Sequence, residues 1–131
     1  MPNTDKCQQL VIRALIQAGW NIVLPAKRYL YKRRRIYLDL VAEKDGQIIY
    51  LEVKCFADDD NNSTDHYQAL GQYLFYRETL RKLQDNTQLY LAIPRRIYLG
   101  LDDVAQTLYK THSISVLMFD EAETDGFQWI N

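Results

Sequence analysis

Residues 36–55 read IYLDLVAEKDGQIIYLEVKC. Two runs rich in β-branched, aromatic and aliphatic residues, 36–43 and 47–55, flank the pair Asp45-Gly46. Asp-Gly between two such runs is a strong signal for a two-residue hairpin turn, because both residues tolerate positive φ. The stretch is therefore predicted to be a β-hairpin in which Lys44 faces Gln47.

This register predicts which side chains meet across the hairpin. It pairs Asp39 with Glu52 and Tyr37 with Lys54, and the Cβ atoms of such opposed pairs lie roughly 5 Å apart. Because side chains alternate along a strand, Asp39, Glu52 and Lys54 are expected on one face. The other face is apolar and is expected to face the core; it carries Leu38, Leu40, Ala42, Ile49, Leu51 and Val53.

The acid-acid-lysine set suits chemistry on a phosphodiester. Two opposed carboxylates repel each other, and a divalent cation between them removes that repulsion. Such a cation polarises a phosphoryl oxygen and lowers the pKa of a bound water, beside which Lys54 would supply positive charge. We therefore expect Asp39 and Glu52 to bind Mg²⁺ or Mn²⁺, with Glu43 as the alternative first acid. The competing interpretation is a surface ion-pair ladder on a half-solvated hairpin.

The pattern on either side of the hairpin indicates a mixed sheet flanked by helices, which is an α/β fold. The other expected elements are, in chain order, a helix with apolar positions from Cys7 to Ala18, a short strand over 20–24, a long helix over 64–83, a strand over 87–93, a short helix over 101–108, and strands over 114–119 and 127–130. At 131 residues the chain is expected to be a single domain over 1–131.

The long helix carries a polar stripe at a spacing of three and four residues, formed by Asp65, Gln68, Gln72 and Tyr76. Gln72 and Tyr76 could hydrogen-bond a carboxylate, a metal-bound water or a phosphate. The alternative is a solvated helix face.

Six of the sixteen basic residues fall between Lys27 and Arg35, although the net charge of the chain is −1. That net charge argues against a general polyanion binder, whereas the local run could clamp a phosphate backbone. Candidate nucleic-acid contacts are Lys32, Arg33, Arg34 and Arg35, together with Tyr76 from the long helix. The alternative is a solvated loop or a protected edge strand. Arg95 and Arg96 are interpreted as solvated surface.

Cys7 and Cys55 lack a metal-ligand spacing and are interpreted as reduced core residues. Together with the absence of a secretory or membrane-spanning apolar run, they indicate a soluble cytoplasmic protein.

The set Asp39, Glu52-Val53-Lys54 and Gln72-x-x-x-Tyr76 resembles the PD-(D/E)XK nuclease superfamily. More narrowly, the chain resembles the XisH family, the fdxN element excision controlling factors of cyanobacteria. The matching stretches are Ala14-Leu15 to Gly19-Trp20, Leu51-Glu52-Val53-Lys54, Ala69-Leu70-Gly71-Gln72-Tyr73-Leu74, Tyr76-Arg77, Leu89-Tyr90-Leu91-Ala92 with Pro94, and Trp129-Ile130-Asn131. Leu38 stands where the superfamily often has Pro, and Gln8 stands where relatives tend to have a polar or His residue.

The resemblance implies a restriction-endonuclease-like fold and a role in programmed DNA rearrangement. It implies DNA as a partner, beside a site-specific recombinase and an XisI-like companion protein, with a homodimer as one expectation. In a nuclease of this kind Asp39, Glu52, Lys54 and Gln72 would be catalytic. The alternatives are a non-catalytic accessory factor that binds DNA or protein and a pure protein-interaction module.

Overall fold

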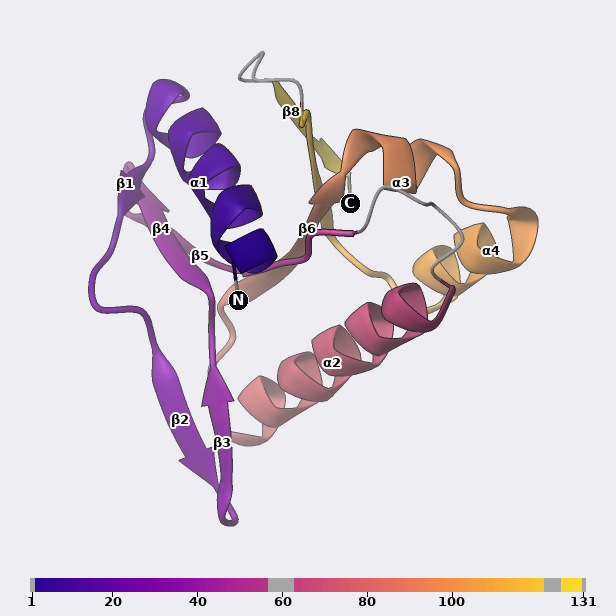
Figure 1. The fold of residues 1–131 in the computed structure, drawn as a ribbon. Helices are drawn as coiled ribbons and strands as arrows, with labels where there is room; N and C mark the ends of the chain where they lie inside the picture. Colours follow the sequence, from indigo (N-terminus) through magenta and orange to yellow (C-terminus); the bar gives the residue numbers. More distant parts are fainter. Residues whose placement is uncertain (1, 57–62, 122–125, 131) are drawn as a thin grey trace.

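The computed structural model describes residues 2–56, 63–121 and 126–130. They form a six-stranded sheet in the order β1-β4-β5-β6-β7-β8 and a separate two-stranded sheet, β2-β3 (Figure 1). The strands are β1 (Asn21–Ile22), β2 (Arg28–Tyr31), β3 (Arg34–Tyr37), β4 (Leu40–Lys44), β5 (Gln47–Val53), β6 (Gln88–Pro94), β7 (Val116–Phe119) and β8 (Phe127–Ile130). The helices are α1 (Pro2–Gln17), α2 (Ser63–Lys82), α3 (Arg95–Leu99) and α4 (Asp103–Thr111).

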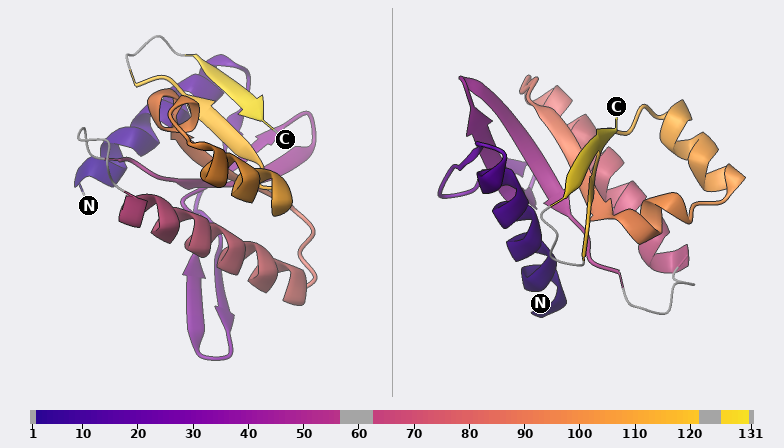
Figure 2. Two further views of the ribbon diagram at one scale, coloured as in Figure 1. Left: turned by 90° about the vertical axis from the view of Figure 1, so that its right-hand side faces the viewer. Right: turned by 90° about the horizontal axis from the view of Figure 1, so that it is seen from above.

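The large sheet is mixed, as predicted. Strands β5, β6 and β7 run parallel to one another, and the other neighbours are antiparallel. Helices cover both faces (Figure 2). On one face α1 packs its apolar positions, such as Val11 and Leu15, against Leu51 and Leu117. On the other face α2 and α4 pack against residues that include Leu91. Away from the exposed turn at residues 45–48, both faces of the β4–β5 hairpin are therefore buried.

The Asp45-Gly46 turn confirms the predicted register. Asp45 has φ of 53° and Gly46 has φ of 84°, as a two-residue hairpin turn of this type requires. Lys44 pairs with Gln47, and the register continues to the pair Leu40 and Leu51.

The first arm of the hairpin is not the continuous strand that was predicted over 36–43. Strand β3 ends at Tyr37 and β4 begins at Leu40. Tyr37 pairs with Arg28, so its predicted pairing with Lys54 is wrong. The chain bends between the two strands, and Leu38 is buried in the cluster under α2 rather than beside Leu40 under α1. The chain bends here because β3 pairs with β2 in the separate two-stranded sheet, whereas β4 belongs to the large sheet.

The basic run folds into this β2–β3 ribbon. Its tip, Lys32 and Arg33, has φ of 48° and 70°. Positive φ at a tight turn normally calls for Gly, Asn or Asp, so the sequence carries no turn signal at this position.

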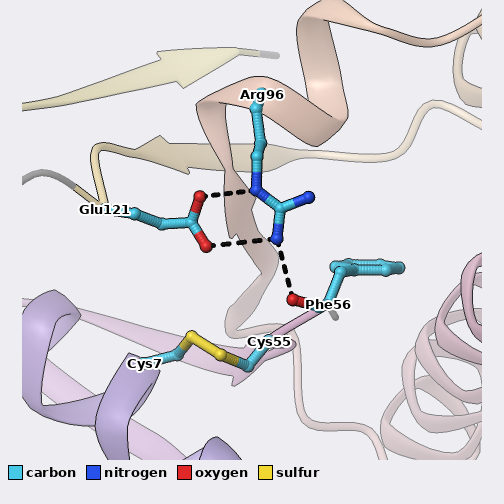
Figure 3. A network of polar contacts seen from close by, with 5 residues as sticks. All are labelled: Cys7, Cys55, Phe56, Arg96 and Glu121. Carbon is cyan, nitrogen blue, oxygen red and sulfur yellow. Dashed lines mark hydrogen bonds and ion pairs between the residues drawn. A yellow bond between two sulfur atoms is a disulfide. The ribbon is translucent and has the colours of Figure 1, made fainter. Parts of the chain in front are cut away.

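Other predicted elements appear close to their expected ranges, including α2, β6, α4, β7 and β8, whereas α3 was missed. Arg96, expected at the solvated surface, lies in the first turn of α3 and takes part in a polar network (Figure 3). Its guanidinium donates to both carboxylate oxygens of Glu121, at 2.7 and 3.3 Å, and to the carbonyl oxygen of Phe56 at 2.8 Å. Arg96 therefore ties the segment after β5 to the segment after β7.

The expectation that both cysteines are reduced is wrong. Cys7 and Cys55 form a disulfide between residues 48 apart in sequence (Figure 3). Packing of α1 over β5 brings their Cα atoms to 5.6 Å, which lies within the range that a disulfide spans.

None of the helices in the described part of the chain is both long enough and apolar enough to cross a membrane.

Candidate active site at the end of the hairpin

The acid pair lies where the two arms of the hairpin separate. Asp39 occupies the bend before β4, Glu52 is the penultimate residue of β5, and Lys54 directly follows that strand. Extending the observed register by one pair places Asp39 opposite Glu52, as predicted. Since β3 turns away at this point, backbone groups that a longer ladder would have paired are left to the side chains.

Each acid accepts a backbone N–H from the opposite arm. The amide of Asp39 donates to Oε2 of Glu52 at 3.0 Å, and the amide of Val53 donates to Oδ2 of Asp39 at 2.8 Å. These reciprocal bonds hold the two carboxylates beside each other.

Glu52 is buried, with 2% of its surface exposed. It lies on the same side of β5 as Tyr50, which belongs to the cluster under α2. Interpretation of the set as a solvated surface ladder is therefore wrong. A fully buried carboxylate costs stability unless it is neutral, paired or bound to a cation, so its presence here needs a reason.

The surroundings disfavour a negative charge on either acid. Burial and, next in size, the neighbouring charge of Asp39 raise the pKa of Glu52 to about 8, against the opposing effects of the Asp39 N–H and of Lys54. Burial also raises the pKa of Asp39 above its ordinary value, partly offset by the Val53 N–H and Lys54. At neutral pH the pair therefore carries a proton on Glu52 unless a cation replaces it.

The alternative first acid, Glu43, is engaged elsewhere. Its carboxylate accepts the amide N–H of Gly46 at 2.9 Å and the side-chain amide of Asn21 at 3.1 Å. These bonds lower the pKa of Glu43 and hold it at the turn end of β4. Between the two candidates, the geometry brings Asp39 to Glu52.

Helix α1 contributes a residue that the spacing arguments did not identify. Nε2 of Gln8 donates to the backbone carbonyl oxygen of Asp39 at 3.2 Å, across 31 residues of sequence. Gln8 drew attention only as a departure from the resembled families. Because the contact depends on how α1 packs over the hairpin, no local pattern could have predicted it. Gln8 also adjoins Cys7 of the disulfide.

The polar stripe on α2 lies on the helix that covers the Glu52 face of the sheet. Gln72 and Tyr76 are half-buried, and Nε2 of Gln72 donates to the Tyr76 hydroxyl at 3.1 Å. That bond joins the two predicted site residues to each other. In the described residues neither of them hydrogen-bonds to Asp39 or Glu52.

The donor set fits a hard divalent cation with an incomplete protein shell. Within residues 2–56, 63–121 and 126–130, no cluster of three or more His, Cys, Asp or Glu side chains is arranged to hold a metal. Asp39 and Glu52 together offer carboxylate oxygens. Mg²⁺ is commonly held by one or two carboxylates with water and substrate oxygens in the remaining positions. The pair therefore suits Mg²⁺ or Mn²⁺ that is shared with a phosphate substrate.

The four basic residues among the predicted nucleic-acid contacts lie on the β2–β3 ribbon rather than around the acid pair, whereas Tyr76 lies on α2. Lys32, Arg33, Arg34 and Arg35 are all exposed. Arg34 differs from the others because its guanidinium lies over the ring of Phe75 on α2, with its central carbon 4.3 Å from the ring centroid.

Comparison with known proteins identifies relatives along almost the whole chain. The family model described as XisH protein matches residues 1–125. The crystal structure of an XisH family protein from Nostoc punctiforme PCC 73102 is 31% identical, with a TM-score of 0.86, covering 97% of this chain and 100% of that one. That of an fdxN element excision controlling factor protein from Anabaena variabilis is 31% identical, with a TM-score of 0.87, covering 97% and 99%. A search of curated proteins finds no match.

Proposed function

The chain belongs to the XisH family, and on that premise we propose that it is a DNA element excision controlling factor with a restriction-endonuclease-like active site. Asp39, Glu52 and Lys54 would act on a DNA phosphodiester with Mg²⁺ or Mn²⁺. The observation that carries this proposal is the buried acid pair. The carboxylate of Glu52 accepts the amide N–H of Asp39, and the carboxylate of Asp39 accepts the amide N–H of Val53. Two carboxylates held side by side in this way, one of them fully buried, destabilise the protein unless a cation or a proton joins them.

Asp39 and Glu52 would hold the metal, which supplies Lewis-acid polarisation of a phosphoryl oxygen when bound. Glu52 would hold the cation as the deprotonated carboxylate. Lys54, whose charge already lowers the pKa of both acids, stabilises negative charge that develops on the phosphate. Gln72 orients the attacking water from α2, and its bond to Tyr76 fixes the amide. Hydrolysis breaks one P–O bond, forms another to the water oxygen, and passes the water proton to the leaving oxygen or to solvent.

Cleavage of plasmid DNA tests this function. Supercoiled, linear and single-stranded DNA are incubated with Mg²⁺ or Mn²⁺ and the wild-type protein, Glu52→Gln or Lys54→Ala. Both variants should cleave slower by about a hundredfold or more. The matched control is Glu43→Gln, which removes an acid from the same hairpin at the turn end and should cleave like the wild type.

Cleavage that survives both Glu52→Gln and Lys54→Ala would show that the activity belongs to another protein or site. Absence of cleavage on every DNA form, with DNA binding retained, would favour the alternative: a non-catalytic accessory factor that assists a site-specific recombinase with an XisI-like companion. Absence of both cleavage and DNA binding would favour a protein-interaction module.

Metal uptake offers a readout that does not depend on activity. Because Glu52 holds a proton at pH 7, binding of Mn²⁺ should release close to one proton. Calorimetric titration in buffers of different ionisation enthalpy measures that number, with Glu52→Gln as the control that releases none. If the wild-type protein shows no heat of Mn²⁺ binding, the metal is excluded from the proposal.

A further inference from the structure

The β2–β3 ribbon projects from the body of the protein. In Figures 1 and 2 it extends beyond the large sheet and past α2. It pairs with no strand of the large sheet. Of the residues in its two strands only Ile36 is fully buried, so packing accounts for little of the ribbon.

Charge is divided sharply between this ribbon and the body. Residues 27–37 contain six basic and no acidic side chains. Since the whole chain has a net charge of −1, the remaining residues carry −7. A polyanion is therefore attracted to the ribbon and repelled by most of the remaining surface.

The two faces of the ribbon differ. Pairing of Tyr29 with Ile36 and of Tyr31 with Arg34 places these four on the face toward the body. On that face Ile36 is buried in the core cluster and Arg34 covers Phe75. The opposite face is exposed throughout, and it consists of Arg28, Leu30, Arg35 and Tyr37.

The ribbon is anchored at its base. The Tyr29 hydroxyl donates to the carboxylate of Asp85, which also accepts the Tyr50 hydroxyl at 2.7 Å. These bonds help to lower the pKa of Asp85 to about 2, so the carboxylate remains charged across the working pH range. The stacking of Arg34 on Phe75 adds a second attachment to α2. A binding element fixed in advance loses little entropy when its ligand arrives.

We infer that the outward face and tip of this ribbon bind the major groove of duplex DNA. This deepens the proposed function, on which it rests for the assumption that DNA is the substrate. Adjacent strands lie about 4.8 Å apart, and with side chains a two-stranded ribbon fits the major groove, about 12 Å wide, but not the minor groove of about 6 Å. Arg28, Arg35, Lys32 and Arg33 contact phosphates and base edges.

The apolar members of the face suit the same partner. Leu30 is 66% exposed and Tyr37 is 48% exposed, although both sit between arginines. In the major groove such side chains can contact thymine methyl groups, which a single strand does not present in a fixed array. Strand β3 leads through Leu38 into Asp39. Docking of the ribbon would therefore set the position of the acid pair on the DNA.

A matched pair of variants on adjacent residues tests the inference. Arg35→Ala and Arg34→Ala remove the same charge from the same strand, but only Arg35 lies on the outward face. Binding of a fluorescent duplex is measured by anisotropy without Mg²⁺, in a Glu52→Gln background that prevents cleavage, and over a range of salt concentrations.

The double variant Arg28→Ala/Arg35→Ala should bind duplex at least about tenfold more weakly, and each substitution should reduce the salt slope by about 1. Arg34→Ala should weaken binding less than Arg35→Ala, because it removes charge and the attachment to Phe75 but no contact with DNA. Thermal melts of all variants show whether the fold is kept. Equal losses for Arg34→Ala and Arg35→Ala, or no loss for either, would overturn the assigned face.

Two further comparisons test the groove. The folded protein should prefer duplex over single strands of the same sequence, and a ligand that fills the minor groove should not displace it. Equal affinity for single strands, or displacement by that ligand, would refute major-groove docking. The result is separable from the proposed chemistry. Cleavage that depends on Glu52 but not on Arg28 and Arg35 would refute only the DNA-binding role of the ribbon. DNA binding that depends on the ribbon but occurs without cleavage would refute only the proposed nuclease activity.

Discussion

Replacing Glu52 with Gln should make the protein more stable, and the gain should grow with pH. Gln keeps the shape of the side chain and retains an oxygen that can accept the Asp39 amide. It removes the charge that burial opposes. The substitution therefore isolates the cost of ionising one buried acid.

The sign and the size follow from the pKa. Folding raises the pKa of Glu52 from an ordinary 4.5 to about 8. A raised acid pKa means that the stabilising protonated state is fully present below 4.5 and is lost as pH rises to about 8. At about 1.4 kcal/mol per pH unit, the wild-type protein loses on the order of 5 kcal/mol relative to Glu52→Gln over this interval, and about 3 kcal/mol of it by pH 7.

Urea denaturation at pH 4.5, 6, 7 and 8.5, in a buffer with a metal chelator, measures this difference directly. Groups that titrate in both proteins, such as Asp85, cancel in the comparison. The two proteins should have similar free energies of unfolding at pH 4.5 and should diverge steadily above it.

Parallel curves would contradict the reasoning, because they would mean that Glu52 ionises with the same pKa in the folded and unfolded protein. A curve for Glu52→Gln that falls below the wild type at pH 8 would show that the charged carboxylate is stabilised by contacts that the burial argument neglects.

Three further changes address the framework. Cys7→Ser should lower the free energy of unfolding by about 4 kcal/mol under oxidising conditions, since the bond to Cys55 closes a loop of 48 residues. Added reductant should lower the free energy of unfolding of the wild-type protein by the same amount and leave that of the variant unchanged. Leu117→Ala should cost about 2–5 kcal/mol, because the side chain is fully buried, whereas Val104→Ala, on a 66% exposed side chain, should change stability little. Gly46→Ala should lower the free energy of unfolding by about 1 kcal/mol, since Gly46 has positive φ. Denaturant midpoints measure the stability of each variant. No loss of stability in Gly46→Ala would contradict the turn geometry.

Local signals in the sequence are sufficient to predict the hairpin and its register. The Asp45-Gly46 pair fixes the turn, and period-two alternation then fixes which residues are opposed. The proximity of Asp39 and Glu52 followed from those two facts alone. It did not depend on how helices pack, which is why it was predictable.

Features that depend on packing or on unusual turns were not predictable in this way. The ribbon turns at Lys32-Arg33, two residues that give no sign of adopting positive φ. The burial of Glu52 depends on α2 covering a face that alternation alone marks as polar. The disulfide depends on α1 crossing β5 at the right height, and two isolated cysteines carry no information on that.

The disulfide also gives the chain an unusual topology. The bond between Cys7 and Cys55 makes a closed covalent ring of everything from α1 to the end of β5, and the ribbon tip is the most outlying part of that ring. A protease such as trypsin, which cuts after Lys32 or Arg33, would open the ring without separating its halves. The nicked protein should migrate as one species until a thiol is added, so a cut in the ribbon would leave the part of the chain with Asp39 and Glu52 still joined to α1.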